Sequence, residues 1–312
     1  MLCIASRQPA QCRPMARTTQ LAFALLGLIW GSNFIFMKMA TAFITPVQVV
    51  FLRVLFGFVP IVLLALGQRA LRLADLRHWP HFLAMSLLAT ALYYFAFAKG
   101  TSLLASSVAG MLSGAIPLFT FVTSYVFLRQ EALTGQKLLG VVLGFLGVFL
   151  IAHPWTVGRN ALNLSGVGYM TLGSVSLGCS FVYARRFMSK LDLSPLALST
   201  YQIGIALIVL AAVTPWRGMS MILSSMPATV GLVLGLGFSG TGLAYVLYYY
   251  IVQRMGAVAA SAVTYLPPIV ALVIGHTIVG EPLELLDLVA LSSILMGVYA
   301  IQFPLQRTPV RS

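Results

Sequence analysis

Charged side chains are scarce in this chain of 312 residues. Lysine, arginine, aspartate and glutamate together make up 8% of it, whereas about 25% is usual for a soluble domain. Acidic residues are the scarcest, with six in all against 19 lysines and arginines, while hydrophobic residues account for 60%. This imbalance argues against a soluble globular protein and predicts an integral membrane protein.

Residues that carry chemistry are also few. The three cysteines, two near the N-terminus and one in an apolar run, do not form a disulfide framework. No glycine-rich loop ends in Gly-Lys-Ser or Gly-Lys-Thr, so ATP hydrolysis is not expected. The four histidines do not show metal-ligand spacing with acidic partners. We therefore expect no metal site, no cofactor and no enzyme activity.

Long apolar runs recur along the whole chain, and each is long enough to cross a bilayer. We predict ten membrane helices joined by short segments, between tails at residues 1–20 and 304–312. The helices are expected at residues 21–41, 47–66, 82–99, 102–128, 134–152, 166–187, 195–214, 227–252, 257–279 and 284–303.

The cations are distributed unevenly among the connecting segments. If the N-terminus is cytoplasmic, fourteen lysines and arginines fall on inner segments and only Lys99, Arg159 and Arg217 on outer ones. Such a bias places both chain termini in the cytoplasm, because cytoplasmic loops of membrane proteins are enriched in Lys and Arg. Cations beside anionic lipid headgroups also explain the net charge of +13 without a nucleic-acid partner.

The chain contains an internal repeat. Residues 109–151 return as residues 259–301 at a constant offset of 150, which pairs Pro117 with Pro267 and Gly147 with Gly297, and Glu131 with Glu281. The expected units are residues 21–152 and 166–303, with five helices each. Because five is odd, the second unit is inverted in the membrane. Inverted repeats are typical of transporters that bind substrate near the midplane, between the halves.

The first helices of each unit match more weakly. Gly31-Ser32-Asn33-Phe34 aligns with Gly178-Cys179-Ser180-Phe181, and Thr45-Pro46 aligns with Ser194-Pro195.

A family resemblance follows from these residues. Trp30-Gly31-Ser32-Asn33-Phe34 followed by Lys38, together with the doubled proline, glutamate and Gly-Val pattern, resembles the EamA-type exporters of the drug/metabolite transporter superfamily. The resemblance covers about residues 20–303 and is strongest to bacterial inner-membrane exporters of amino acids and metabolites, including aromatic amino acids. It implies ten helices around a central cavity lined by the first, third, fourth, sixth, eighth and ninth.

Two helices combine prolines with polar groups. Ser113 and Pro117 lie on a small-residue stripe, and since proline frees a carbonyl in the preceding turn, this stretch is expected to form a cavity wall. A packing seam is the alternative for the rest of the stripe. Pro267, next to Pro268, frees carbonyls that would accept a substrate ammonium, beside Tyr265 on the same helix; a plain kink is the alternative.

Further candidates come from four other helices and from the end of the ninth. Aromatic and polar side chains there would suit an apolar or aromatic substrate, although some tyrosines would instead belong to interfacial belts. These candidates are Trp30, Asn33, Tyr93, Ser180, Tyr183, Thr241, Tyr245 and His276.

Titratable and charged groups inside the expected helices are few. Lys38 and Arg53 lie toward the outer ends of the first two helices, where cations more often snorkel or bind carbonyls than hold substrate. All six acids lie at or outside helix ends, and His276 is the one plausible buried proton carrier. We therefore expect facilitated efflux without obligatory proton antiport.

The sequence thus predicts a secondary transporter, monomeric or weakly dimeric, of the bacterial inner membrane. It would export a small-molecule substrate, namely amino acids or similar amphipathic metabolites, by alternating access. One alternative is a sugar-phosphate or nucleotide-sugar exchanger, which needs more cations in its cavity than Lys38 and Arg53 provide. A membrane enzyme acting on lipid-linked substrates is another, but it needs an embedded acid, base or metal set that is not found.

Overall fold

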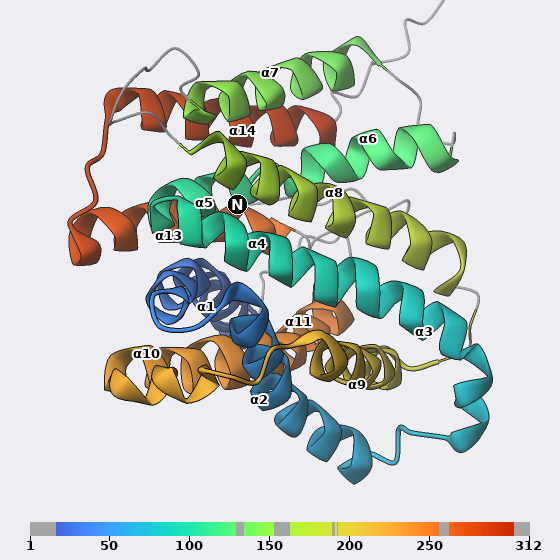
Figure 1. Cartoon of the computed structure of the whole chain (residues 1–312). Coiled ribbons are helices and arrows are strands. Elements are labelled where there is room, and N and C mark those ends of the chain that lie inside the picture. Colours follow the sequence, from blue (N-terminus) through green and yellow to red (C-terminus); the bar gives the residue numbers. More distant parts are fainter. Residues whose placement is uncertain are drawn as a thin grey trace, which may run out of the picture.

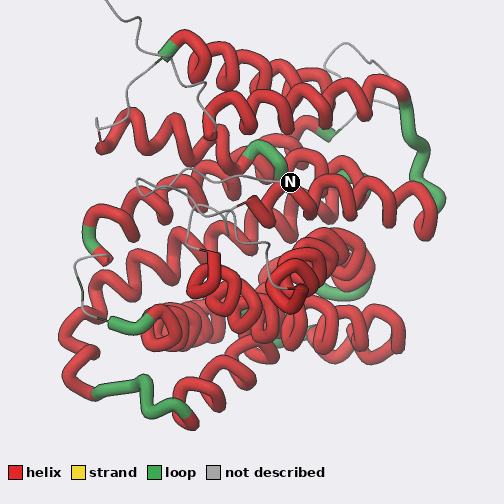
Figure 2. The backbone as a smooth tube through the Cα atoms, turned by 180° about the vertical axis from the view of Figure 1, so that it is seen from behind, coloured by secondary structure: helices red, strands yellow, loops and turns green. Residues whose placement is uncertain are grey.

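The computed structural model describes residues 17–128, 134–152, 163–188, 191, 193–255 and 262–302. Ten of its helical segments are long and apolar enough to cross a membrane, and the described residues include no strand. Figure 2 shows short loops at the connections between helices that the structure describes. The predicted all-α membrane fold is confirmed.

Five spans form the first repeat. They are α1 (Arg17–Thr41), α2 (Pro46–Gly67), a third span that runs from η1 (Leu73–His78) through α3 (Trp79–Ser86) and η2 (Leu87–Ala91) to α4 (Leu92–Leu103), a fourth made of α5 (Ser106–Ser113) and α6 (Ile116–Leu128), and α7 (Gly135–Ala152). The third span is longer than expected. The fourth begins at residue 106 rather than 102, because Leu104 is extended and turns the chain.

The second repeat has the same order. Its spans are α8 (Leu164–Arg186), α9 (Pro195–Val213), an eighth made of α10 (Met226–Val230), η5 (Gly231–Leu243) and α11 (Ala244–Met255), a ninth made of η6 (Ala262–Tyr265), α13 (Leu266–Ile274) and η7 (Gly275–Val279), and α14 (Leu285–Gln302). A further turn, η4 (Met219–Ser224), precedes α10.

Matching start signals begin the second helix of each repeat. Thr45 caps α2 by accepting a hydrogen bond from the Gln48 backbone N–H, and the Gln48 side chain returns one to the Thr45 N–H. Ser194 caps α9 in the same way, through the Ala197 N–H. Each cap is followed by a proline, which suits the first helical position because no N–H is needed there.

The contacts between repeats are reciprocal. The α2 helix packs on η5, and its counterpart α9 packs on α3 and η2; α1 contacts η5 and α11, and α8 contacts η2 and α4; α7 lies along α14, at the top of Figure 1. Such exchange of partners is what a two-fold relation between the halves produces. We call the end at which α1 begins the proximal end, and the opposite end the distal end.

The outer surface of the bundle is apolar. Leu63 on α2, Ile208 on α9 and Phe238 on η5 have exposed fractions of 62%, 70% and 48%. Side chains of this kind around a helical bundle are expected to face lipid, since water would not favour so much exposed apolar surface. Buried polar side chains of the spans, among them Asn33, Arg53 and Thr241, lie instead in the interior of the bundle.

Candidate functional site

The fourth and ninth spans are both broken at matching positions. The second segments begin at Ile116 in α6 and at Leu266 in α13, which are 150 residues apart. Pro117 and Pro267 follow directly, at a helical position that requires no N–H. Gly114 lies beside Pro268, with 3.1 Å between the Pro268 Cγ and the place of a Cβ at Gly114. The two breaks therefore meet between the repeats.

The backbone at these breaks is closely covered. Ser113 is buried, and its hydroxyl donates to the Gly110 carbonyl at 2.6 Å. The α1 helix crosses the second break at Gly31, where an added Cβ would come within 3.1 Å of the Pro267 carbonyl oxygen. Discontinuous helices at the repeat interface are where secondary transporters commonly hold substrate. Substrate contact by Ser113, Pro117 and Pro267 remains a prediction.

A buried cation lies beside the third span of the other repeat. Arg53 on α2 is 6% exposed. Its Nε donates to the Thr241 hydroxyl at 3.1 Å. With the Asn33 amide oriented to satisfy both of its ends, the Asn33 oxygen accepts from Arg53 Nη2 at 3.2 Å and its nitrogen donates to the Ile29 carbonyl at 3.2 Å. Asn33 and Thr241, predicted from sequence, are thus brought together by a residue that was not.

The remaining polar contacts of the guanidinium are long, and one aromatic ring lies beside it. Nη1 lies 3.9 Å from the Met37 sulfur, and Nη2 lies 3.5 Å from the Gly240 carbonyl oxygen. The Arg53 Cζ stands 4.0 Å from the centre of the Tyr94 ring, a cation–π contact. Within the described part of the chain, no carboxylate pairs with Arg53.

Sequence reasoning placed Arg53 correctly along its helix but did not foresee its burial. A signal was available: extending the Thr45-Pro46 and Ser194-Pro195 alignment by seven residues pairs Arg53 with Gln202. Two polar residues at one repeat position, each inside an apolar run, point to the interior rather than to lipid.

Aromatic rings extend from this cation. The Tyr94 ring centre lies 5.1 Å from that of Tyr93, Tyr93 lies 4.6 Å from Phe97, and Phe97 lies 6.2 Å from Phe34 on α1. We call Phe34, Tyr93, Tyr94 and Phe97 the aromatic wall. It joins Tyr93, a predicted site residue, to Arg53, Asn33 and Thr241, which we call the Arg53 cluster.

The other predicted residues lie apart from this cluster or contact it less directly. Trp30 packs against Tyr248, with ring centres 6.0 Å apart. The Tyr183 hydroxyl is 2.8 Å from His81 Nδ1, near the proximal end. Ser180 is buried and donates to the Leu177 carbonyl at 2.7 Å.

Three more predicted residues belong to the second repeat. Tyr245 and Tyr265 are half-buried and pack against the main core. The Tyr265 hydroxyl is buried and has no hydrogen-bond partner among the described residues. His276 is exposed at the distal end, where its Nδ1 lies 3.1 Å from the Glu281 carbonyl oxygen.

The distal end is held by Glu281. One carboxylate oxygen accepts from the Ser106 N–H at 2.7 Å and from its hydroxyl at 2.8 Å, and the other accepts from the Ser107 N–H at 2.8 Å. We call this contact, which links the second repeat to the start of α5, the distal latch. Its repeat counterpart Glu131 lies outside the described residues.

Lys38 holds the same corner from α1. Its ammonium donates to the carbonyls of Leu104 at 2.6 Å and Ser102 at 3.2 Å, at the end of α4. Binding to carbonyls, one of the two roles expected for such a cation, is confirmed. Lys38 therefore fixes the chain on one side of the corner, and Glu281 fixes it on the other.

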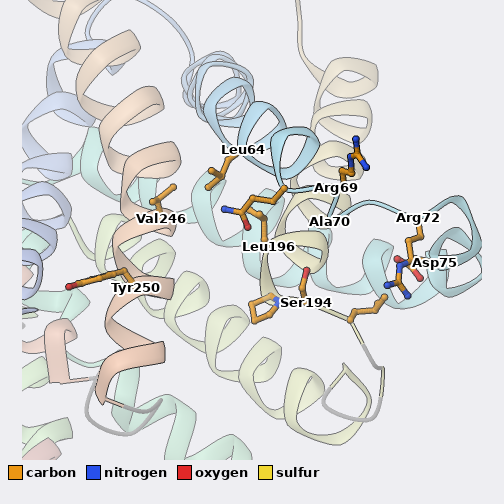
Figure 3. Close-up of a pocket in the computed structure, with 12 residues that line it drawn as sticks. Leu64, Arg69, Ala70, Arg72, Asp75, Ser194, Leu196, Val246 and Tyr250 are labelled. Carbon is orange, nitrogen blue, oxygen red and sulfur yellow. The ribbon is translucent and has the colours of Figure 1, made fainter.

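The proximal end contains a cleft of about 680 Å³ between α2, α9 and α11. Figure 3 shows Leu64 of α2 lying toward Val246 of α11, with Tyr250 about one turn further along α11. Leu64 is about three turns along α2 from Arg53. Between them, an added Cβ at Gly57 would come within 2.5 Å of Thr241, so the helices are in contact there. The Arg53 cluster is closed off from the cleft in this arrangement.

Known proteins resemble the chain over both repeats. The model of the EamA-like transporter family matches residues 17–153 and 164–303. An "Uncharacterized transporter" of Archaeoglobus fulgidus is 26% identical to this chain, and the match covers 90% of this chain and 97% of that protein. The "Uncharacterized inner membrane transporter YedA" of Escherichia coli is 23% identical, covering 90% and 89%. A solved crystal structure shares the fold, with a TM-score of 0.57 and 18% identity over 91% of this chain and 96% of its own.

Proposed function

Because the chain belongs to the EamA-like transporter family, we propose that it is a secondary transporter that exports amino acids or similar small amphipathic metabolites. Membership of the family makes it a multi-pass membrane transporter; the substrate and the direction are the proposal. The observation that carries it is the Arg53 cluster with its aromatic wall, a buried polar and aromatic site built by α1, α2, α4 and η5 from both repeats.

The proposed mechanism is alternating access. In this arrangement the distal latch joins the repeats at one end, while a cleft opens at the other and stops short of Arg53. Release of the distal latch would let substrate leave toward the distal side. The broken fourth and ninth spans supply the points at which one half would bend against the other.

We place the protein in the inner membrane of a bacterium with both termini in the cytoplasm, so that the distal end faces outward. The fourteen-to-three cation bias supports this orientation, and the name of the E. coli relative supports the inner membrane. Reporter fusions at Arg159 and at the C-terminus are expected to report opposite sides of the membrane. Both reporters on one side would contradict the orientation.

The substrate class is tested by counterflow in proteoliposomes with labelled aromatic and aliphatic amino acids, sugar phosphates and nucleotide sugars. We expect exchange of at least one amino acid and none of the phosphates. The second candidate, a phosphate exchanger, gains some support from the buried Arg53, but Lys38 is already bound to carbonyls at the distal end. Phosphate exchange without amino-acid exchange would contradict the proposal.

The same liposomes test energy coupling. The described carboxylates lie at span ends or between spans, and His276 is exposed and faces a carbonyl. We therefore expect the substrate to equilibrate, with no accumulation when a pH gradient is imposed. Accumulation against the substrate gradient that is lost in His276→Ala would show a proton-coupled carrier instead.

A further inference from the structure

Arg53 has a structural counterpart that carries no charge. It lies on the second helix of the first repeat and donates from Nε to Thr241, in the third span of the second repeat, at 3.1 Å. Gln202 lies on the second helix of the second repeat and donates from Nε2 to Thr90, in the third span of the first repeat, at 3.0 Å. The two hydrogen bonds are related by the exchange of repeats, and only one of their donors is a cation.

This comparison separates the architectural role of the position from its charge. A glutamine amide is sufficient to join a second helix to the opposite third span, since Gln202 does so while buried. A guanidinium at the matching position adds a positive charge, which is buried away from water and has no carboxylate partner among the described residues. Buried charges are costly unless they are paired, and ionisable groups inside membrane proteins usually mark substrate or ion sites.

The guanidinium also retains hydrogen-bonding capacity. Its five N–H groups form a planar fork suited to two carboxylate oxygens. The two terminal nitrogens have only the Asn33 oxygen at 3.2 Å, the Gly240 carbonyl at 3.5 Å and the Met37 sulfur at 3.9 Å. Asn33 and Met37 lie one turn apart on α1. A shift of this helix would therefore remove both of their contacts with the guanidinium at once.

We propose that Arg53 binds the carboxylate of the transported substrate, which takes the place of the Asn33 oxygen and the Met37 sulfur. The aromatic wall beside it holds the apolar or aromatic body of the same molecule. One cation suits a single carboxylate better than a phosphate ester, whose charge is larger. This inference rests on the proposed function and specifies it: the substrate must carry a free acid group.

The test compares an acid with its amide in the intact protein. Proteoliposomes are supplied with labelled phenylalanine, leucine and their carboxamides, and initial counterflow rates are measured at low concentration. Variants are Arg53→Gln, which copies Gln202, and Arg53→Met, an apolar replacement of similar length that a buried site tolerates. Arg53→Lys keeps the charge. Arg77→Gln, at an exposed arginine of η1, is the matched control for loss of one charge.

Wild type and Arg77→Gln are expected to prefer the acid over the amide by about 30-fold or more, as for a buried charge pair. Arg53→Gln and Arg53→Met should lose this preference while eluting as folded monodisperse protein, and Arg53→Lys should keep part of it. If either folded neutral variant retains the preference, or wild type moves the amide as fast as the acid, Arg53 does not bind the carboxylate. The proposal that the protein transports amino acids is unaffected by that result. Exchange of sugar phosphates alone would overturn both.

Discussion

Replacement of Gly297 by leucine is expected to prevent the protein from folding stably. An added Cβ at Gly297 on α14 would lie 2.5 Å from the Gly140 carbonyl oxygen and 2.6 Å from the Gly144 nitrogen on α7. These atoms belong to the backbone, so no side chain is available to move aside. Small residues allow this close approach of helices in lipid, and a leucine would force α7 and α14 apart.

The expected cost is more than about 3 kcal/mol, above the usual range of about 1–3 kcal/mol for overpacked cores because the backbone of α7 is met, against a total stability of about 5–15 kcal/mol. Thermal unfolding and size-exclusion elution of a fluorescent fusion measure it. Gly168→Leu is the matched control, because Gly168 is an exposed helical glycine of α8 and nothing lies within 4 Å of an added Cβ there. If Gly297→Leu elutes and melts like this control, the two helices are not in contact as described.

The contact at Gly297 also shows how much of the fold could be predicted from the sequence. An added Cβ at Gly147 would approach the backbone of Ala290 and Ile294, the residues 150 positions beyond Gly140 and Gly144. Gly147 and Gly297 are equivalent in the two repeats, and the residues that each of them meets are equivalent as well. The offset of 150 was readable from sequence, because inverted repeats keep the same small residues wherever their helices meet.

The site was less predictable than the fold. Asn33 and Thr241 were recognised as polar residues in apolar runs, and they do meet. Arg53 was judged only by its distance from a helix end. Its burial depends on η5 and α1 packing over it. The pattern of α2 taken alone does not reveal this, because most of its faces are apolar, and the sequence signal comes only from the repeat alignment with Gln202. The packing partner of each face is set by tertiary contacts between segments far apart in sequence.

Loss of the Glu281 carboxylate is expected to open the distal end. The three hydrogen bonds that it accepts from Ser106 and Ser107 involve a charged acceptor, and such bonds contribute about 1.5–3 kcal/mol each. Glu281→Gln keeps the size of the side chain but has one acceptor oxygen and no charge. Losing one such bond would raise the population of open molecules about 10-fold or more.

The measurement uses Leu112→Cys as a reporter, in a background without native cysteines. Leu112 is buried in α5, more than one turn inward from the latch, so its thiol reacts with a membrane-impermeant reagent only when the distal end opens. Labelling is expected to be about 10-fold faster with Glu281→Gln than without it. The exposed Glu284→Gln is the control. Equal labelling rates in all three proteins would rule out the latch.

The latch should also respond to acid. Burial acts to raise the pKa of Glu281, but hydrogen bonds from Ser107 and Ser106 outweigh it, so the pKa is lowered from the ordinary glutamate value. Its contribution to stability is therefore complete at neutral pH, begins to decline as the pH falls below the ordinary glutamate pKa, and is lost as the pH falls through the lowered pKa. Acid lowers the thiolate fraction of the reporter equally in both proteins, so the rates are compared at the same pH. The labelling rate with Glu281 relative to that with Glu281→Gln should rise toward one in that acidic range.

Alternating access between the two inverted halves is tested most directly by making the distal latch covalent and removable. Ser106→Cys and Glu281→Cys are joined by a short bis-methanethiosulfonate reagent, which forms a reducible disulfide with each thiol and releases a sulfinate. The link lies where the Ser106 hydroxyl and Glu281 carboxylate are 2.8 Å apart. Counterflow of the amino acid found to be exchanged should stop in the cross-linked protein and return on reduction, while each single-cysteine variant continues to transport after the same treatment. Unchanged counterflow through the cross-linked protein would contradict the mechanism, because substrate would then cross without the distal end opening.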